Sequence, residues 1–143
     1  MADILIVDDD PGILSTLREI LELNGFTVET SADAADAIEK VKETPFLIAL
    51  LDIKLPNMEG TSLLMEIRKI RPATKCIMVT GFASLDNAVQ SLNSGAAAYI
   101  MKPVNPGGLI NTIREKIREL EAENEITEKK VTEWASDQLL RLS

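Results

Sequence analysis

The segment "ILIVDDDP", residues 4–11, places four aliphatic side chains directly before three consecutive aspartates. A short, fully apolar run of this kind is typical of a strand that is buried on both faces of a parallel sheet. Asp10 precedes Pro11, which predicts a helix N-cap followed by proline in the first helical position. Because one helix start needs only one cap, Asp8 and Asp9 call for another explanation.

Four further apolar runs follow along the chain, and amphipathic segments with helical spacing separate them; the runs are residues 26–28, 46–51, 76–79 and 99–101. Strands that alternate with helices predict a parallel sheet that is covered on both faces. Five such units suit a flavodoxin-like, doubly wound (βα)5 three-layer sandwich with strand order 2-1-3-4-5. In such a sheet ligands bind beyond the carboxyl ends of strands one and three.

The composition limits the classes of function. The chain has 143 residues, of which 45% are hydrophobic and 27% charged, as in a soluble globular domain. The net charge of −8 argues against direct nucleic-acid binding, which requires a basic surface. No signal peptide or membrane-spanning run is recognisable. The single cysteine, Cys76, provides no disulfide framework and favours the cytoplasm, and the absence of histidine excludes histidine-based metal sites.

Polar side chains follow the predicted strands at the points where they end. Asp8 and Asp9 follow the first strand, Asp52 the third and Thr80 the fourth, while the fifth runs into Lys102. Each residue taken alone has an ordinary interpretation, such as a turn residue for Asp52. Their coincidence at the carboxyl ends of neighbouring strands instead predicts one shared site.

The charges indicate what this site binds. Two carboxylates about 5 Å apart repel each other by about 3 kcal/mol at an effective dielectric constant near 20. Lys102 offsets one negative charge, and the remaining excess suits a hard divalent cation. An all-oxygen site without histidine or cysteine favours Mg²⁺ over Zn²⁺, and Mg²⁺ keeps open positions for phosphate oxygens. The residues therefore predict a Mg²⁺-dependent site that handles phosphate.

Four motifs in order, "ILIVDDDP", "LLDIKLPNMEG", "IMVTGFAS" and "AAAYIMKPVNP", closely resemble the receiver domain of two-component response regulators of the chemotaxis-regulator type. The resemblance covers residues 3 to about 118. It implies that Asp52 accepts a phosphoryl group from the phosphohistidine of a partner kinase. It also implies that Asp9 binds Mg²⁺ directly, that Asp8 assists through water, and that Asp52 and the backbone carbonyl of Lys54 complete the protein ligands. Lys54 and Phe82 flank the site and are expected to tune hydrolysis of the phosphoaspartate.

The same resemblance assigns roles to the later motifs. Lys102 is expected to pair with a phosphoryl oxygen, and its bond to Pro103 is expected to be cis, as in the family. Thr80 is the implied switch hydroxyl, and Tyr99 is the implied switch aromatic that moves into the space that Thr80 vacates. Phosphorylation would then favour an active arrangement of the face formed by the fourth helix, fifth strand and fifth helix.

The partners follow from these roles. The phosphodonor is a histidine kinase, a phosphotransfer protein or a small phosphodonor, and the output is a downstream protein or domain. The chain is expected to be a signalling domain that assists its own phosphorylation and dephosphorylation, and not an enzyme. Two alternatives are a Mg²⁺-dependent phosphatase of the haloacid dehalogenase type and a flavin- or nucleotide-binding flavodoxin-like protein. The first needs an acid at Lys54, and the second needs a hydroxyl- and glycine-rich loop at residues 8–11.

The sequence divides into a receiver domain at residues 1–120 and a helical extension or linker at residues 121–143. Uncharged residues recur at alternating spacings of three and four, the pattern of a heptad seam; they are Ile110, Ile113, Ile117, Leu120, Asn124, Thr127, Val131 and Trp134. One interpretation is a helix that forms a homodimer or signals to an output module. The other is a charged tail that contacts its own domain. The sequence leaves open whether the chain stands alone or is the front of a longer regulator.

Overall fold

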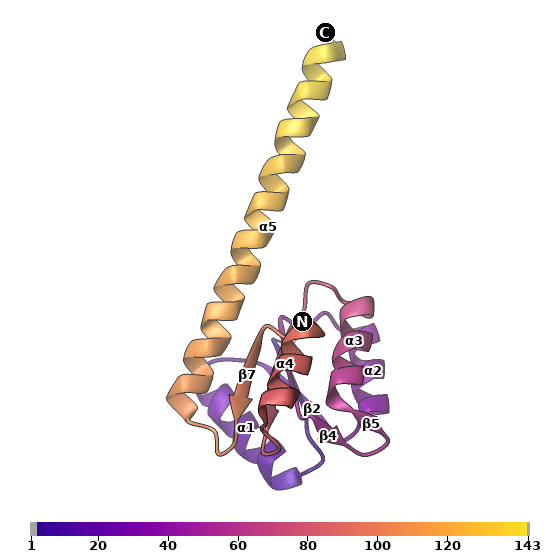
Figure 1. Cartoon of the computed structure of the whole chain (residues 1–143). Coiled ribbons are helices and arrows are strands. Elements are labelled where there is room, and N and C mark those ends of the chain that lie inside the picture. The colour runs from indigo at the N-terminus through magenta and orange to yellow at the C-terminus, as the bar shows by residue number, and fades with distance from the viewer. Residues whose placement is uncertain (1–2, 143) are drawn as a thin grey trace.

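The computed structural model describes residues 3–142 and shows strands alternating with helices (Figure 1). The elements are β1 (Ile4–Val7), α1 (Pro11–Leu23), β2 (Val28–Ser31), α2 (Ala34–Glu43), β3 (Ile48–Leu51), β4 (Lys54–Leu55), β5 (Met58–Glu59), α3 (Gly60–Ile70), β6 (Lys75–Thr80), α4 (Leu85–Asn93), β7 (Ala98–Met101) and α5 (Pro106–Leu142).

Five parallel strands form one sheet in the order β2-β1-β3-β6-β7. Since β4 and β5 form a separate two-residue hairpin, β6 and β7 are the fourth and fifth strands expected from the sequence. The predicted flavodoxin-like order 2-1-3-4-5 is therefore confirmed. Val7 lies opposite Leu51 in the register, and the Asp52 N–H donates to the Val7 carbonyl at 3.1 Å. The strands β1 and β3 thus end side by side, and their next residues meet at one edge of the sheet.

The sheet is covered on both faces because successive residues of a strand point to opposite sides. Leu5 and Val7 belong to one buried cluster, together with side chains of α2 and α3. Ile4 and Ile6 belong to a second cluster, with side chains of α1 and α5. Figure 1 shows the same arrangement, with α2 and α3 on one side of the sheet and α1 and α5 on the other. Every residue of β1 and β3 is buried, which explains the unbroken apolar runs.

Two of the apolar runs differ from the strands in their bounds. The run at 26–28 ends at Val28, where β2 begins, and β2 extends through Ser31. The later residues of β2 are polar because the strand lies at the edge of the sheet, where its two central side chains are only half-buried. The run at 46–51 begins too early, because Phe46 fills the core from the loop before β3.

Helix α5 is a single helix of 37 residues, so the expected boundary between residues 120 and 121 falls inside it. Its first part packs on the sheet through Ile110 and Ile113, and Leu120 further along is also buried. The remainder projects away from the domain (Figure 1), and every side chain from residue 121 to 134 is exposed. The ends of the two expected segments, residues 1–2 and 143, lie outside the described residues. Within residues 3–142, every helix is too short or too polar to cross a bilayer.

Candidate functional site

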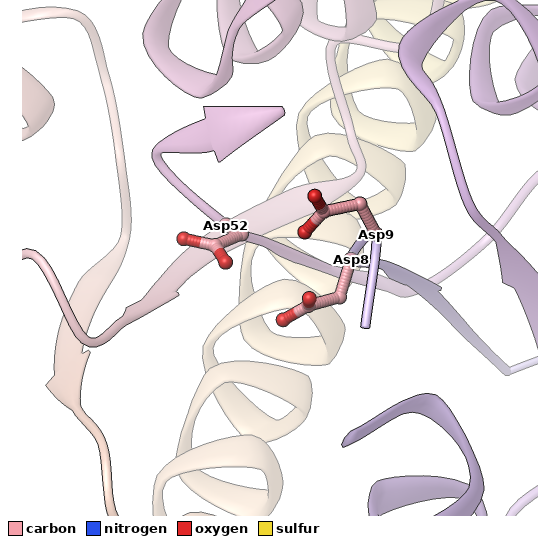
Figure 2. Close-up of side chains that lie close together, drawn as sticks. All are labelled: Asp8, Asp9 and Asp52. Carbon is pink, nitrogen blue, oxygen red and sulfur yellow. The ribbon is translucent and has the colours of Figure 1, made fainter. Parts of the chain in front are cut away.

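Three aspartates meet where β1 and β3 end. Asp8 and Asp9 follow β1 and Asp52 follows β3, and one carboxylate oxygen from each lies within 4.8 Å of the others. Figure 2 shows the three side chains gathered at this edge of the sheet. Asp8 and Asp52 are 3% and 4% exposed, whereas Asp9 is open to solvent. The site therefore combines two buried carboxylates with one accessible carboxylate.

The backbone after β1 holds the first two acids in place. Asp10 caps α1 as predicted, because its Oδ1 accepts from the Gly12 N–H at 2.8 Å and from the Ile13 N–H at 3.4 Å. The Asp10 N–H in turn donates to Asp8 Oδ1 at 3.0 Å. The cap thus fixes the turn in which Asp8 points into the site. The carboxylate of Asp10 itself is engaged in capping α1.

Lys102 reaches the cluster from the end of β7. Its Nζ donates to Asp8 Oδ2 at 2.6 Å and to Asp52 Oδ2 at 3.0 Å, and its peptide bond to Pro103 is cis. Burial raises the pKa of Asp8 above its ordinary value, and this effect outweighs the opposing effect of Lys102. Burial alone would lower the pKa of Lys102, but its hydrogen bonds and charge attraction to Asp8 and Asp52 raise it. One ammonium group therefore bridges the two buried carboxylates.

The two expected switch residues lie on the neighbouring strands. Thr80 ends β6 and is fully buried, and its Oγ1 accepts from the Phe82 N–H at 3.1 Å. Tyr99 lies on β7, opposite Met78, and is half-buried. Its hydroxyl is enclosed by protein, and no hydrogen-bond partner for it is found among the described residues. The Thr80 hydroxyl is thus held by a backbone N–H, whereas the Tyr99 hydroxyl is buried without a hydrogen-bond partner among the described residues.

Gly60 is a site residue that the sequence reasoning missed, because the last residue of the motif "LLDIKLPNMEG" was given no role. The structure places Gly60 at the first position of α3, packed against the end of β3. A Cβ added there would lie 1.9 Å from the backbone oxygen of Asp52, so only glycine fits without moving the backbone. The helical spacing of apolar residues that begins directly after it was the available signal. The segment between Asp52 and Gly60 contains the hairpin β4–β5, with Asn57 at a φ of 67°.

Lys54 and Phe82 contact each other at the rim of the site. The Lys54 Nζ lies 5.0 Å from the centroid of the Phe82 ring, within the range of a cation–π contact. The Lys54 N–H lies 3.4 Å from Asp52 Oδ1. The residue two positions after Asp52 is therefore a cation stacked on an aromatic ring, where a haloacid dehalogenase would need an acid.

The donor set fits a hard divalent cation. The three grouped ligand atoms are carboxylate oxygens, the chemistry that Mg²⁺ prefers. Lys102 neutralises one of the three negative charges, which leaves an excess that a divalent cation balances. Fold and site together thus define a class: a flavodoxin-like domain with an acidic cluster at the switch point of its parallel sheet.

Comparison with known proteins gives the family. The response regulator receiver domain model matches residues 4–114, most of the chain. A receiver domain protein described as CheY-like, from Methanospirillum hungatei, is 54% identical, with a TM-score of 0.82 over 86% of this chain and 98% of that one. A response regulator from Burkholderia pseudomallei, crystallised with a phosphorylated aspartic acid, a calcium ion and citrate, is 27% identical, with a TM-score of 0.76 over 89% of this chain and 75% of that one. The chain belongs to the response regulator receiver domain family.

Curated relatives show the setting in which such domains occur. The transcriptional regulatory protein ZraR of Klebsiella oxytoca is 35% identical over 95% of this chain, and AlgB of Pseudomonas syringae is 35% identical over 90%. This chain spans only 30% and 29% of their lengths. The chain is thus a receiver domain of two-component signalling, a signalling domain, and the phosphatase and flavodoxin alternatives are set aside.

Proposed function

We propose that Asp52 accepts a phosphoryl group from the phosphohistidine of a partner protein. The observation that supports this most directly is the buried Asp52 carboxylate within an acidic cluster and bridged by Lys102. Lys102 holds Oδ2 at 3.0 Å, so we assign Oδ1 as the attacking atom. The new Oδ1–P bond forms as the N–P bond of the phosphohistidine breaks, and the imidazole leaves with the electron pair of that bond. The product is an acyl phosphate on Asp52.

The charges around Asp52 supply what this transfer needs. Mg²⁺ would be held directly by Asp9, through water by Asp8, and by Asp52 and the Lys54 carbonyl. When bound, the ion would neutralise charge on the transferring phosphoryl group. Lys102 releases Asp52 Oδ2 and pairs with a phosphoryl oxygen, so one cation serves the site before and after transfer. This is electrostatic stabilisation by groups that are already in position.

An apolar groove beside the site supports a protein as phosphodonor. It runs between α1 and the segment after β7, and its lining includes the apolar side chains Ile13, Ile20, Pro103 and Val104 together with Lys102 of the site. A helix that carried the phosphohistidine would place its apolar side chains in this groove. For any kinase found to phosphorylate the chain, Ile20→Glu should slow transfer from the kinase while leaving labelling by a small phosphodonor intact.

Phosphorylation would change the face formed by α4, β7 and α5, which a downstream partner recognises. Thr80 would bond a phosphoryl oxygen, and the Tyr99 side chain would move inward as Thr80 does. The unmet hydrogen bond of Tyr99 supports this, because an enclosed hydroxyl without a partner favours movement toward one. Exposed Leu85, Val89 and Met101 lie on the same face and suit an apolar partner. A downstream protein or output domain would bind there.

Hydrolysis of the phosphoaspartate would be tuned by Lys54 and Phe82, which stand at the rim of the site. The domain would in this way assist its own dephosphorylation, with the cytoplasm as its compartment. The reduced, buried Cys76 is compatible with that compartment.

The decisive experiment is incubation with acetyl phosphate and Mg²⁺ followed by intact-mass measurement. We expect one added phosphoryl group on the wild-type chain, no adduct on Asp52→Asn, and a strongly slowed adduct on Asp9→Asn or without Mg²⁺. The control is Asp10→Asn, because Asp10 caps α1 and an asparagine cap preserves that bond. An adduct that persists in Asp52→Asn would refute the assignment.

A further inference from the structure

The part of α5 that extends beyond the domain carries a stripe without formal charge as far as Gln138, and the last seam position is Arg141. Between residues 110 and 138 the chain has 13 charged side chains, and none of them occupies a seam position. Within this stripe Val131 is 59% exposed and Trp134 is 64% exposed. An isolated helix of about 20 residues is marginally stable in water unless an apolar face is covered. The stripe therefore calls for a partner that is complementary to it.

The same stripe packs on the domain further back along the helix. Ile110 and Ile113 are buried in the cluster that packs on the sheet, Leu120 is also buried, and all three occupy the same heptad positions as the exposed residues beyond them. Helix α5 is unbroken from Pro106 to Leu142. In a parallel pair, a second α5 would lie about 8–10 Å away along the stripe, and its first half would enter the space of the first copy's sheet. The fold thus blocks a parallel, in-register pair of straight helices.

An antiparallel pair of the segments 124–142 avoids this collision. Each domain then lies at its own end of the pair, and the overlap is about 28 Å long. When Val131 of one copy lies level with Trp134 of the other, the remaining seam positions also meet: Thr127 with Gln138, and Asn124 with Arg141. A small side chain faces a large one in both central layers, whereas a parallel pair would oppose two tryptophans.

The charges beside the stripe favour the same arrangement. In the antiparallel register Lys130 of each copy flanks Asp137 of the other, which gives two attractive pairs. Glu128 faces the neutral Ala135. In a parallel register Glu123, which forms an ion pair with Lys75 of its own domain, would face Glu128, and Lys130 would face only Ala135, so neither pair is attractive.

From these observations we infer that α5 residues 124–142 bind the same segment of a second copy of this chain in an antiparallel pair, with the two receiver domains at opposite ends. The inference does not depend on phosphorylation of Asp52. The interface is small and mostly polar, so the pair forms at high protein concentration and separates on dilution.

Sedimentation of the full chain over a concentration series tests whether two copies pair. Variants that exchange the charges of Lys130 and Asp137 test whether the pair is antiparallel. We expect the apparent mass to rise from one chain to two. Lys130→Asp should weaken the pairing about tenfold, because two attractive pairs become repulsive. The double variant Lys130→Asp with Asp137→Lys should restore it to within about twofold. The matched control is Lys129→Asp, which makes the same charge change on the side of the helix away from the stripe.

A distance measurement gives an independent reading. With a spin label on Glu121→Cys, the two labels should be about 35 Å apart, because 23 residues of helical rise separate them in the antiparallel register. Cys76 stays unlabelled, since burial raises the pKa of its thiol to about 12. A label distance of about 15 Å or less, a mass of one chain at every concentration, or a failure of the double variant to restore pairing would each overturn the inference.

Discussion

Replacement of Lys102 by methionine tests the electrostatics of the site most directly. Methionine keeps much of the volume of the lysine stem but removes the charge that bridges Asp8 and Asp52 at 2.6 and 3.0 Å. Removing one partner of a buried ion pair costs about 3–5 kcal/mol, because the remaining charge is left buried and unpaired. Protonation of a carboxyl limits this cost, so we expect the metal-free variant to lose about 3 kcal/mol at pH 7. For a chain of this size that corresponds to a fall in Tm of about 10 °C.

The stability that Lys102→Met loses should depend on pH and on Mg²⁺. Burial already raises the folded-state pKa of Asp8 above the ordinary value of 3.8, and loss of the lysine would raise it further. A group with a raised carboxyl pKa stabilises the fold as the pH falls through that pKa. Lys102→Met should therefore recover stability relative to wild type as the pH falls from 7 toward the ordinary carboxyl pKa of 3.8. Mg²⁺ at 100 times its Kd would restore about 2.7 kcal/mol, since it binds only the folded state.

A second substitution shows which carboxylate is left unpaired when Lys102 is removed. The measurement is thermal unfolding of the metal-free protein. Asp8→Asn in the Lys102→Met background should recover most of the lost Tm. Asp9→Asn should recover little, because Asp9 is exposed and the ion pairs of Lys102 among the described residues are with Asp8 and Asp52. An unchanged Tm in Lys102→Met, or equal rescue by both aspartate substitutions, would contradict this account.

Three further outcomes are expected. Gly60→Ala should lower the free energy of unfolding by about 3 kcal/mol, because its Cβ would overlap the Asp52 backbone oxygen; chemical denaturation would show this, with Gly107→Ala, which has room for a methyl group, as the unaffected control. Tyr99→Phe should raise the metal-free free energy of unfolding by about 1 kcal/mol, since it removes an enclosed hydroxyl without a partner, and a fall would argue against that enclosure. Cys76, with its pKa raised to about 12 by burial, should resist thiol reagents at pH 8 and react only on unfolding, and fast labelling of the native chain would show that it is accessible.

The prediction of the sheet succeeded where burial was uniform. Residues 4–7 and 48–51 are apolar without interruption because both of their strands are covered on both faces, and this signal survives in the sequence. The edge strand β2 has a weaker signal, because an edge position tolerates polar residues and its apolar run stops at Val28 although the strand continues through Ser31. The cap formed by Asp10 was recognisable because its bonds are made within three residues.

Local sequence alone determined the strands, the cap and the placement of acids at strand ends, since each depends on neighbours a few residues apart. Only the tertiary structure decided how those acids share one cation, since Lys102 lies 94 residues from Asp8 in the chain and 50 from Asp52. It likewise decided the need for glycine at position 60, which arises from a backbone oxygen on another element. The direction in which α5 is free to pair also depends on the fold, because a heptad pattern does not state which side of the helix its own domain occupies.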